Sequence, residues 1–219
     1  METLGIYIHV PFCAKKCDYC DFYSVPYRKN LSDNFVNAVL RNLKHYSDRE
    51  KITDTVYFGG GTPSLLSAEQ IDKILDGVRK NFCLSESPEI TLETNPVTVN
   101  FDKLCDLRNI GVNRLSLGVQ SFNDNELDFL GRKHSADRAE KSVTDAYKAG
   151  FENISCDLMI ALPNQTAENI EYSVKKISNL PVSHVSAYIL KTEKGTPFDC
   201  DEIKNSLPDD DTTAELYIA

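Results

Sequence analysis

Three cysteines lie within eight residues near the start of the chain, in the segment HVPFCAKKCDYCDFYS (9–24). Cys13, Cys17 and Cys20 follow the spacing C-x3-C-x2-C, with no fourth cysteine nearby. Thiolates suit zinc or iron–sulfur clusters, and a structural zinc site takes four ligands, usually as two paired halves. The chain has no second C-x2-C and no H-x3-H. The spacing therefore favours a 4Fe–4S cluster on three thiolates, whose remaining iron is open to a small-molecule ligand.

A glycine-rich segment, YFGGGTPSLL (57–66), joins a strand-like stretch to a helix-like one. Gly59, Gly60 and Gly61 let the backbone approach a ligand closely and would offer exposed amide donors. Two other interpretations are a tight strand–helix turn and a dinucleotide-binding fingerprint, although the third glycine of that fingerprint is missing. This segment alone does not decide between them.

Four polar residues follow or end strand-like stretches. They are Glu93 in LETNP, Gln120 in GVQSF, Arg132 in LGRKH and Asp157 in DLMIALP. Each has a structural interpretation as well, namely a surface cation, an internal salt-bridge partner or a cap. Their common position at one edge of the predicted sheet favours a binding site. The other cysteines (Cys83, Cys105, Cys156 and Cys200) stand singly and are interpreted as buried thiols.

Strand-like and helix-like stretches alternate along the chain. Six strands are predicted, at 4–10, 55–60, 89–95, 113–122, 153–162 and 184–191. Helices are predicted at 31–47 with an N-cap at Ser32, at 67–82 opened by Ser67, at 135–150 and at 166–180. This order predicts βαβ units, a parallel sheet and one domain over residues 1–219.

The predicted strands have one polar face, whereas a parallel strand covered on both faces reads as continuously apolar. Glu93, Arg114 and Asp157 lie on the polar faces, and burying them in a dry core would be costly. His9 also falls on this face and is expected to point into the interior. An incompletely closed α/β barrel with a wet interior resolves the conflict, with its chemistry at the carboxyl ends of the strands.

Taken together, YIHVPFC, the cysteine spacing, GGGTPSLL, GVQSF, LGRKH and DLMIALPNQ resemble the radical S-adenosylmethionine (SAM) superfamily, in its coproporphyrinogen-oxidase-like branch. The resemblance implies a partial (β/α)6 TIM-like barrel and a 4Fe–4S cluster on Cys13, Cys17 and Cys20. SAM would chelate the open iron, and one electron would cleave it to a deoxyadenosyl radical. The implied cosubstrate contacts are Tyr7, Gly60, Gly61, Thr62, Glu93, Gln120, Arg132 and Asp157, with Tyr19 packing near the adenine.

Two members of that branch share these motifs, the oxygen-independent coproporphyrinogen III oxidase and the HemW-type heme chaperone. The oxidase pattern has a further cysteine where this chain has Phe22, and it has an extension ahead of the first strand, which begins here at about Leu4. Both departures favour the chaperone type, with the oxidase (a coproporphyrinogen dehydrogenase) as the alternative. A zinc-stabilised structural barrel is the third interpretation. Ala161 stands where the family usually has glycine, which could alter the backbone beside Asp157.

The chaperone interpretation implies heme as a further ligand. Its partners would be SAM, heme or a porphyrinogen, heme-acceptor proteins and an electron donor. The family continues beyond TAELYIA with a C-terminal region, so the chain is expected to be truncated within a helix opened by Asp211 and Thr212. The net charge of −9 argues against a nucleic-acid surface. The absence of a signal peptide or a transmembrane segment, together with seven cysteines, predicts a cytoplasmic protein.

Overall fold

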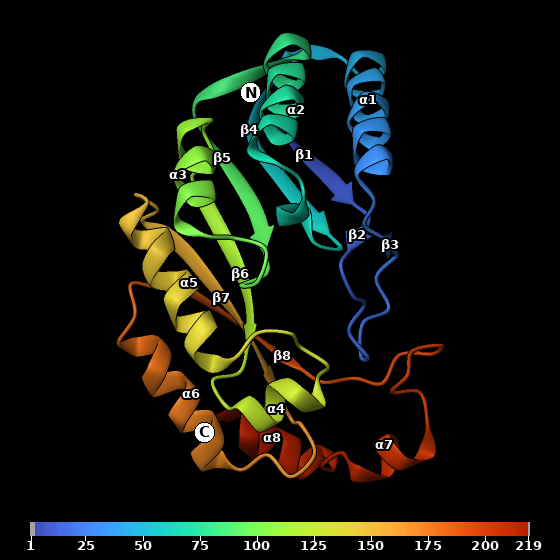
Figure 1. The fold of residues 1–219 in the computed structure, drawn as a ribbon, viewed down its shortest axis with the longest axis vertical. Coiled ribbons are helices and arrows are strands. Elements are labelled where there is room, and N and C mark those ends of the chain that lie inside the picture. The colour runs from blue at the N-terminus through green and yellow to red at the C-terminus, as the bar shows by residue number, and fades with distance from the viewer. Residues whose placement is uncertain (1–2, 219) are drawn as a thin grey trace.

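The computed structural model describes residues 3–218, which form a curled, six-stranded parallel sheet with helices on its outer side (Figure 1). The strand order is β1-β4-β5-β6-β7-β8. These strands are β1 (Thr3–Val10), β4 (Asp48–Gly60), β5 (Phe82–Thr94), β6 (Arg114–Gln120), β7 (Asn153–Ile160) and β8 (His184–Ile189). Every predicted strand is present, and the expected half-barrel is confirmed.

The connections between the strands are helical. They are α1 (Lys29–His45), the 3-10 turn η1 (Pro63–Leu65), α2 (Ala68–Asn81), α3 (Phe101–Asn109), α4 (Asp124–Phe129), α5 (Ala136–Lys148) and α6 (Ala167–Ser178), with α7 (Asp201–Ser206) and α8 (Asp210–Ile218) after the last strand. A small second sheet pairs β2 (Phe12–Cys13) with β3 (Val25–Pro26). The short elements α3, α4, α7, β2 and β3 were not predicted, because they are too short to show a hydrophobic period.

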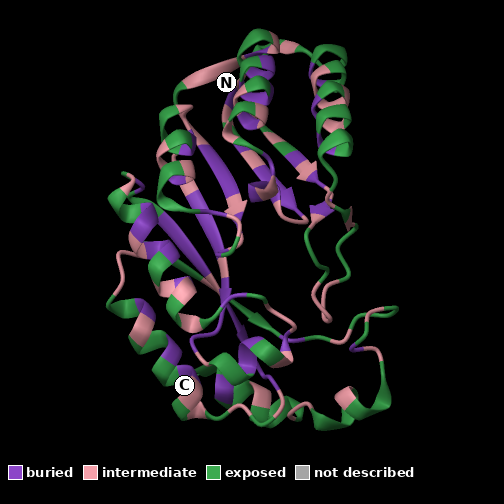
Figure 2. Cartoon of the chain, in the orientation of Figure 1, coloured by how far each residue is buried: buried purple, intermediate pink, exposed green. Residues whose placement is uncertain are grey.

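The main hydrophobic core lies between the sheet and the outer helices. The apolar side chains of the strands pack there against helix residues such as Ile71, Ile74 and Val78 of α2, all of which are fully buried. Figure 2 shows this division, with buried residues on the strands and on the helix sides that face them. The alternation seen in the sequence therefore separates an apolar outer face from a polar inner face.

The strand register aligns the polar side chains of the inner face in rows. Tyr7 pairs with Tyr57, which pairs with Thr91, and Thr91 pairs with Arg114. In the next row toward the carboxyl ends, His9 pairs with Gly59. In the same row on the other strands, Glu93 pairs with Ser116, Ser116 with Ser155, and Ser155 with His184 on the edge strand β8. These rows confirm that His9, Glu93 and Arg114 lie on the inner face.

The helix starts were predicted with mixed success. Ser67 begins α2 with a capping box, in which Ser67 Oγ accepts from Gln70 N at 3.1 Å and Gln70 Oε1 accepts from Ser67 N at 3.0 Å. The N-cap at Ser32 was wrong, because α1 starts after Arg28 and Ser32 is buried inside its first turn. There Ser32 Oγ donates to Lys29 O at 2.8 Å and accepts from the Gln70 side chain at 3.0 Å, which joins α1 to α2.

Two further expectations concern the single cysteines and membrane-spanning segments. Cys156 is buried and Cys83 and Cys105 are half-buried, but Cys200 is exposed, so its assignment as a buried thiol was wrong. It precedes α7, where the chain has left the core. Over residues 3–218, every helix is too short or too polar to cross a bilayer.

Ala161, at the position where the resemblance implies glycine, adopts a left-handed backbone with φ of 61° and is buried. This conformation costs an L-residue about 1–2 kcal/mol. The alanine recovers about 1 kcal/mol through its buried methyl group and about 0.5–1 kcal/mol through a less flexible unfolded chain. We therefore expect Ala161→Gly to change the free energy of unfolding by less than about 1 kcal/mol. Ala161→Val should lose more than about 2 kcal/mol, since a β-branched residue is poorly tolerated here. Urea titrations of both variants would measure this, and a large loss in Ala161→Gly would contradict it.

Candidate functional site

The three cysteines lie on a loop that is closed at its base. Cys13 ends β2, and Val25 N donates to Pro11 O at 2.7 Å while Tyr27 N donates to Cys13 O at 3.0 Å. A turn brings Cys20 N to within 3.2 Å of Cys17 O. All three thiols are free and half-buried. The loop is thus anchored at the carboxyl end of β1, where the sequence predicted it.

The thiols lie close to one another and to two residues from other elements. Burial raises the pKa of the Cys20 thiol, and the neighbouring Cys17 and Cys13 raise it further. Thr62 Oγ1 is 3.7 Å from Cys13 Sγ, and Arg132 Nη1 is 3.4 Å from Cys17 Sγ. A guanidinium and a hydroxyl beside the sulfurs would stabilise the thiolate form that metals bind.

The ligand geometry bears on the choice between zinc and a cluster. Over the described range 3–218, no three His, Cys, Asp or Glu side chains are close enough to share a single metal ion. A structural zinc site needs four such ligands around one ion. In a 4Fe–4S cluster each cysteine binds a different iron, so the sulfurs need not converge on one point. The thiols therefore fit a cluster better than zinc.

The glycine segment packs directly on the start of the cysteine loop. Gly61 N donates to Val10 O at 2.9 Å and Thr62 N to Phe12 O at 2.7 Å, while Gly60 N donates to Glu93 Oε2 at 3.1 Å. For Gly60 and Gly61, the expectation of exposed amide donors was therefore wrong, because both amides already have partners. The backbone group that this segment would present to a ligand is a carbonyl, which suits an ammonium rather than an anion.

We expect Gly61→Ala to displace the cysteine loop. A methyl group at Gly61 would lie 2.6 Å from Phe12 O, and a backbone atom cannot move aside as a flexible side chain can. Overpacking of this kind costs about 1–3 kcal/mol. Chemical denaturation should show that loss, and the iron bound after anaerobic reconstitution should fall. Gly195→Ala is the control for iron content: an added methyl there meets nothing within 4 Å and Gly195 is not on the cysteine loop, so its left-handed backbone (φ of 84°) costs stability without displacing the loop. Equal iron contents in the two variants would contradict the expectation.

Two carboxylates face the interior near the loop. Glu93 accepts hydrogen bonds from Tyr57 Oη at 2.9 Å and from Gly60 N, and Asp157 accepts from Ser116 Oγ at 3.1 Å. Burial raises the pKa of Glu93, and it raises the pKa of Asp157 to about 6 with a further contribution from Glu93. Burial opposes the ionisation of both carboxyl groups, and Glu93 also opposes that of Asp157, so a cationic ligand beside them would favour their charged forms.

Arg132 reaches the site from the segment between α4 and α5. It donates through Nη2 to Gly118 O and through Nη1 to Tyr19 Oη at 3.3 Å. Burial raises the pKa of Tyr19, whose ring lies 6.5 Å from that of Phe198. Arg132 Nε is buried with no partner among the described residues, which is unusual for a guanidinium. Arg132 therefore joins the cysteine loop to the end of β6.

The remaining predicted residues are Tyr7 and Gln120. Tyr7 is 59% exposed on the inner face and stacks on Tyr57 with ring centroids 5.9 Å apart. Gln120 ends β6 in a left-handed conformation, with φ of 70°, and is buried. The structure thus brings the predicted residues to one end of the sheet. The prediction missed Tyr57 and Ser116 as partners of the carboxylates, although their positions on the same polar faces indicate them.

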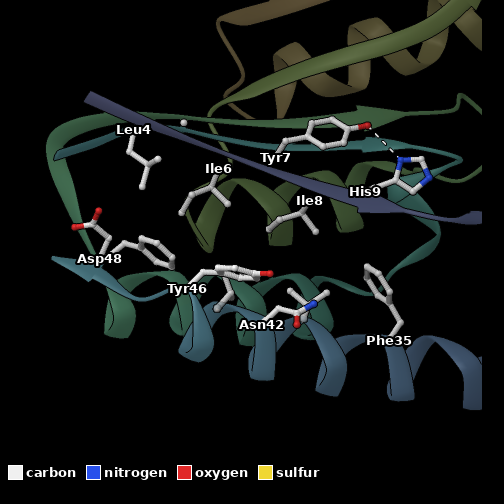
Figure 3. Close-up of a pocket in the computed structure, with 13 residues that line it drawn as sticks. Leu4, Ile6, Tyr7, Ile8, His9, Phe35, Asn42, Tyr46 and Asp48 are labelled. Carbon is white, nitrogen blue, oxygen red and sulfur yellow. Dashed lines mark hydrogen bonds between the residues drawn. The ribbon is translucent and has the colours of Figure 1, made fainter. Parts of the chain in front are cut away.

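Of two pockets in the structure, only the smaller belongs to this site. It has a volume of about 240 Å³, and its lining includes Cys17, Thr62 and Arg132. The larger, of about 530 Å³, lies between β1 and α1 and is lined by apolar side chains such as Ile6 and Ile8. Figure 3 shows these pointing toward α1, while Tyr7 and His9 point to the opposite side of the strand. The larger pocket is therefore on the outer face, away from the cysteines.

Comparison with known proteins decides the family. The sequence profile described as "Radical SAM superfamily" matches residues 7–177. The chain belongs to this superfamily. The superfamily implies a 4Fe–4S cluster and SAM. This agrees with the three thiols, with the two buried carboxyl groups and with a glycine segment whose bonded amides leave carbonyl groups to face a ligand.

Similar proteins within the superfamily confirm the resemblance inferred from the motifs. The chain is 38% identical to "Heme chaperone HemW" of Escherichia coli (strain K12), over 99% of this chain and 58% of that protein. It is also 38% identical to "Heme chaperone HemW" of Lactococcus lactis subsp. lactis (strain IL1403), over 96% of this chain and 56% of that protein. The solved structure of coproporphyrinogen III oxidase (HemN) from Escherichia coli superposes with a TM-score of 0.88 at 27% identity, over 99% of this chain and 51% of that one. This radical SAM chain thus spans less than two thirds of the length of these relatives.

Proposed function

We propose that this chain is the radical SAM core of a heme chaperone of the HemW type. The observation that carries the proposal is the 38% identity to heme chaperones over 99% of the chain, compared with 27% to the structurally similar oxidase. Phe22 supports it, because the oxidase pattern has a cysteine at this position. Heme-acceptor proteins and an electron donor are the partners that this function requires.

The cofactor site is proposed from the donor set. Cys13, Cys17 and Cys20 would bind three irons of a 4Fe–4S cluster, and SAM would bind the fourth. When bound, the cluster supplies the single electron that cleaves SAM in this superfamily. The chain's own part is to hold the loop, through Gly61 N and Thr62 N, and to place a guanidinium beside Cys17.

The cosubstrate contacts are proposed from charge. SAM carries a sulfonium and an ammonium, which Glu93 and Asp157 would attract and which Gly60 and Gly61 could accept through carbonyl groups. Arg132 would bind the carboxylate of SAM. The other proposed contacts, all of which line the same end of the sheet, are Tyr7, Tyr19, Thr62 and Gln120.

The test is an anaerobic assay of the reconstituted protein with two kinds of substrate. With heme and an acceptor hemoprotein, the chaperone function predicts stable heme binding and transfer to the acceptor. With coproporphyrinogen III, SAM and a reductant, it predicts no protoporphyrinogen. Formation of protoporphyrinogen would instead establish the oxidase function, which the 0.88 TM-score to HemN makes the specific alternative.

A further inference from the structure

Arg114 is a cation on the inner face of the sheet that the proposed cosubstrate site does not use. It begins β6, and its side chain is 18% exposed. Nη1 donates to Thr91 Oγ1 at 3.3 Å and lies 3.9 Å from Glu89 Oε1. Nε and Nη2 have no hydrogen-bond partner among residues 3–218, and neither nitrogen is buried away from solvent. Most of this guanidinium is therefore available to a ligand.

The alternative is that Arg114 serves only as the ion-pair partner of Glu89. The 3.9 Å separation is at the outer limit of an ion pair, and the Glu89 side chain is 43% exposed. Such exposed pairs contribute about 0–1 kcal/mol. The same Glu89 oxygen also accepts from Thr91 Oγ1 at 2.8 Å. Arginine binds carboxylates most strongly through two parallel hydrogen bonds, and Glu89 does not make them.

A second donor lies on the same face. His184 starts β8, is exposed, and its Nδ1 is 2.8 Å from Ser155 Oγ. When Ser155 donates to Nδ1, the ring proton is on Nε2, which is then a free donor. His184 aligns with Ser155 and Ser116, one row from Arg114. It lies two strands from β6, or about 10 Å across the sheet.

The position of Arg114 limits the size of the ligand. It lies four residues before Gly118, whose carbonyl accepts from Arg132 at the cosubstrate end. At about 3.3 Å per residue, this places Arg114 about 13 Å deeper along the strand. Glu93, which aligns with Ser116, lies one row closer to the mouth than Arg114, and Asp157 bonds to the same Ser116, while Glu89 is the carboxylate beside Arg114 itself. A ligand that uses both ends must be large and must carry its negative charge away from the mouth.

We propose that Arg114, with His184 as a second donor, binds the propionate carboxylates of a tetrapyrrole on the inner face of the sheet. This deepens the proposed heme-chaperone function and rests on it. A tetrapyrrole is long enough to extend from the mouth to Arg114, and heme carries two such carboxylates. The Arg114 guanidinium would donate to one carboxylate through Nε and Nη2, and His184 Nε2 would donate to the other.

The experiment compares heme with heme dimethyl ester, which keeps the macrocycle but has no carboxylate. Their dissociation constants are measured by absorbance titration for the wild-type protein, Arg114→Gln, Arg114→Lys and His184→Gln. Arg108→Gln is the matched control, since Arg108 is an exposed arginine bonded to Gly150 O through its Nε. A hydrogen bond to a charged group is worth about 1.5–3 kcal/mol.

The wild-type protein and Arg108→Gln should bind heme at least about 10-fold more tightly than its ester. Arg114→Gln should lose most of this preference and keep only the part that His184 supplies, with its ester affinity unchanged. Arg114→Lys should recover part of the preference, and His184→Gln should lose a smaller part. Equal affinities of the wild-type protein for heme and ester would overturn the carboxylate site, as would an undiminished preference in Arg114→Gln. Failure of the wild-type protein to bind either compound would overturn the heme-chaperone function as well.

Discussion

Cys17→Ala is expected to abolish cluster assembly while leaving the barrel folded. Two thiolates cannot hold a cluster that the proposed site binds through three, and no other cysteine of the chain is on this loop. Cys17 is half-buried on a loop outside the hydrophobic core, so its truncation removes little packing. After anaerobic reconstitution, the variant should lack iron, sulfide and the broad visible absorbance of a cluster. Its thermal midpoint without cluster should stay within about 4 °C of the wild type.

Cys105→Ala is the control for this experiment. Cys105 is also a half-buried free thiol, but it lies on α3 and is not part of the cysteine loop. It should keep the full iron and sulfide content. A Cys17→Ala protein that retained the wild-type absorbance would show that the cluster is held elsewhere. One that retained a single divalent ion would restore the zinc interpretation.

Asp157→Asn is expected to stabilise the chain and to weaken its binding of SAM. The carboxyl pKa is raised from its usual 3.8 to about 6, mainly by burial. Between these two values the folded state holds a proton that the unfolded state has lost, so stability falls as the pH rises. About two pKa units correspond to about 3 kcal/mol that the wild type loses by neutral pH. The asparagine has no charge to bury, so the variant should not show this loss.

The measurement is a pair of urea titrations, at pH 5 and pH 7.5, with Asp106→Asn as an exposed control. From pH 5 to pH 7.5 the stability advantage of Asp157→Asn should grow by about 1–2 kcal/mol, whereas that of Asp106→Asn should not change. In the reconstituted protein, Asp157→Asn should bind SAM at least about 10-fold more weakly, because a charge-assisted contact is lost. A parallel pH dependence in the two variants would contradict the burial of a charge at Asp157. An unchanged SAM affinity would remove Asp157 from the site.

Much of the fold could be predicted from the sequence, because the two-residue alternation of its strands and the 3.6-residue period of its helices are both strong. The alternation on β5 and β6 separates Glu93 and Arg114 from their apolar neighbours, and the structure places these residues on the inner face. Ser67 was a correct N-cap because its capping-box partner is three residues away. Ser32 was wrong because its hydroxyl has a tertiary role, which local sequence does not reveal.

The site could be predicted in composition but not in its internal connections. The cysteine spacing predicts a metal-binding loop, since three soft ligands within eight residues have few other uses. The sequence could not show that the amides of Gly61 and Thr62 are already occupied, because their acceptors, Val10 O and Phe12 O, are backbone atoms that any residue could supply. Nor could it show that Tyr57 holds Glu93, since this depends on the register between β4 and β5.

The two hydrogen bonds from Gly61 and Thr62 to the chain before Cys13 make the metal loop and the glycine segment one mechanical unit. A chimera that exchanges the metal loop with that of a relative must therefore exchange the glycine segment too. Transplanting one segment without the other would disrupt these two hydrogen bonds, even if every thiol were retained.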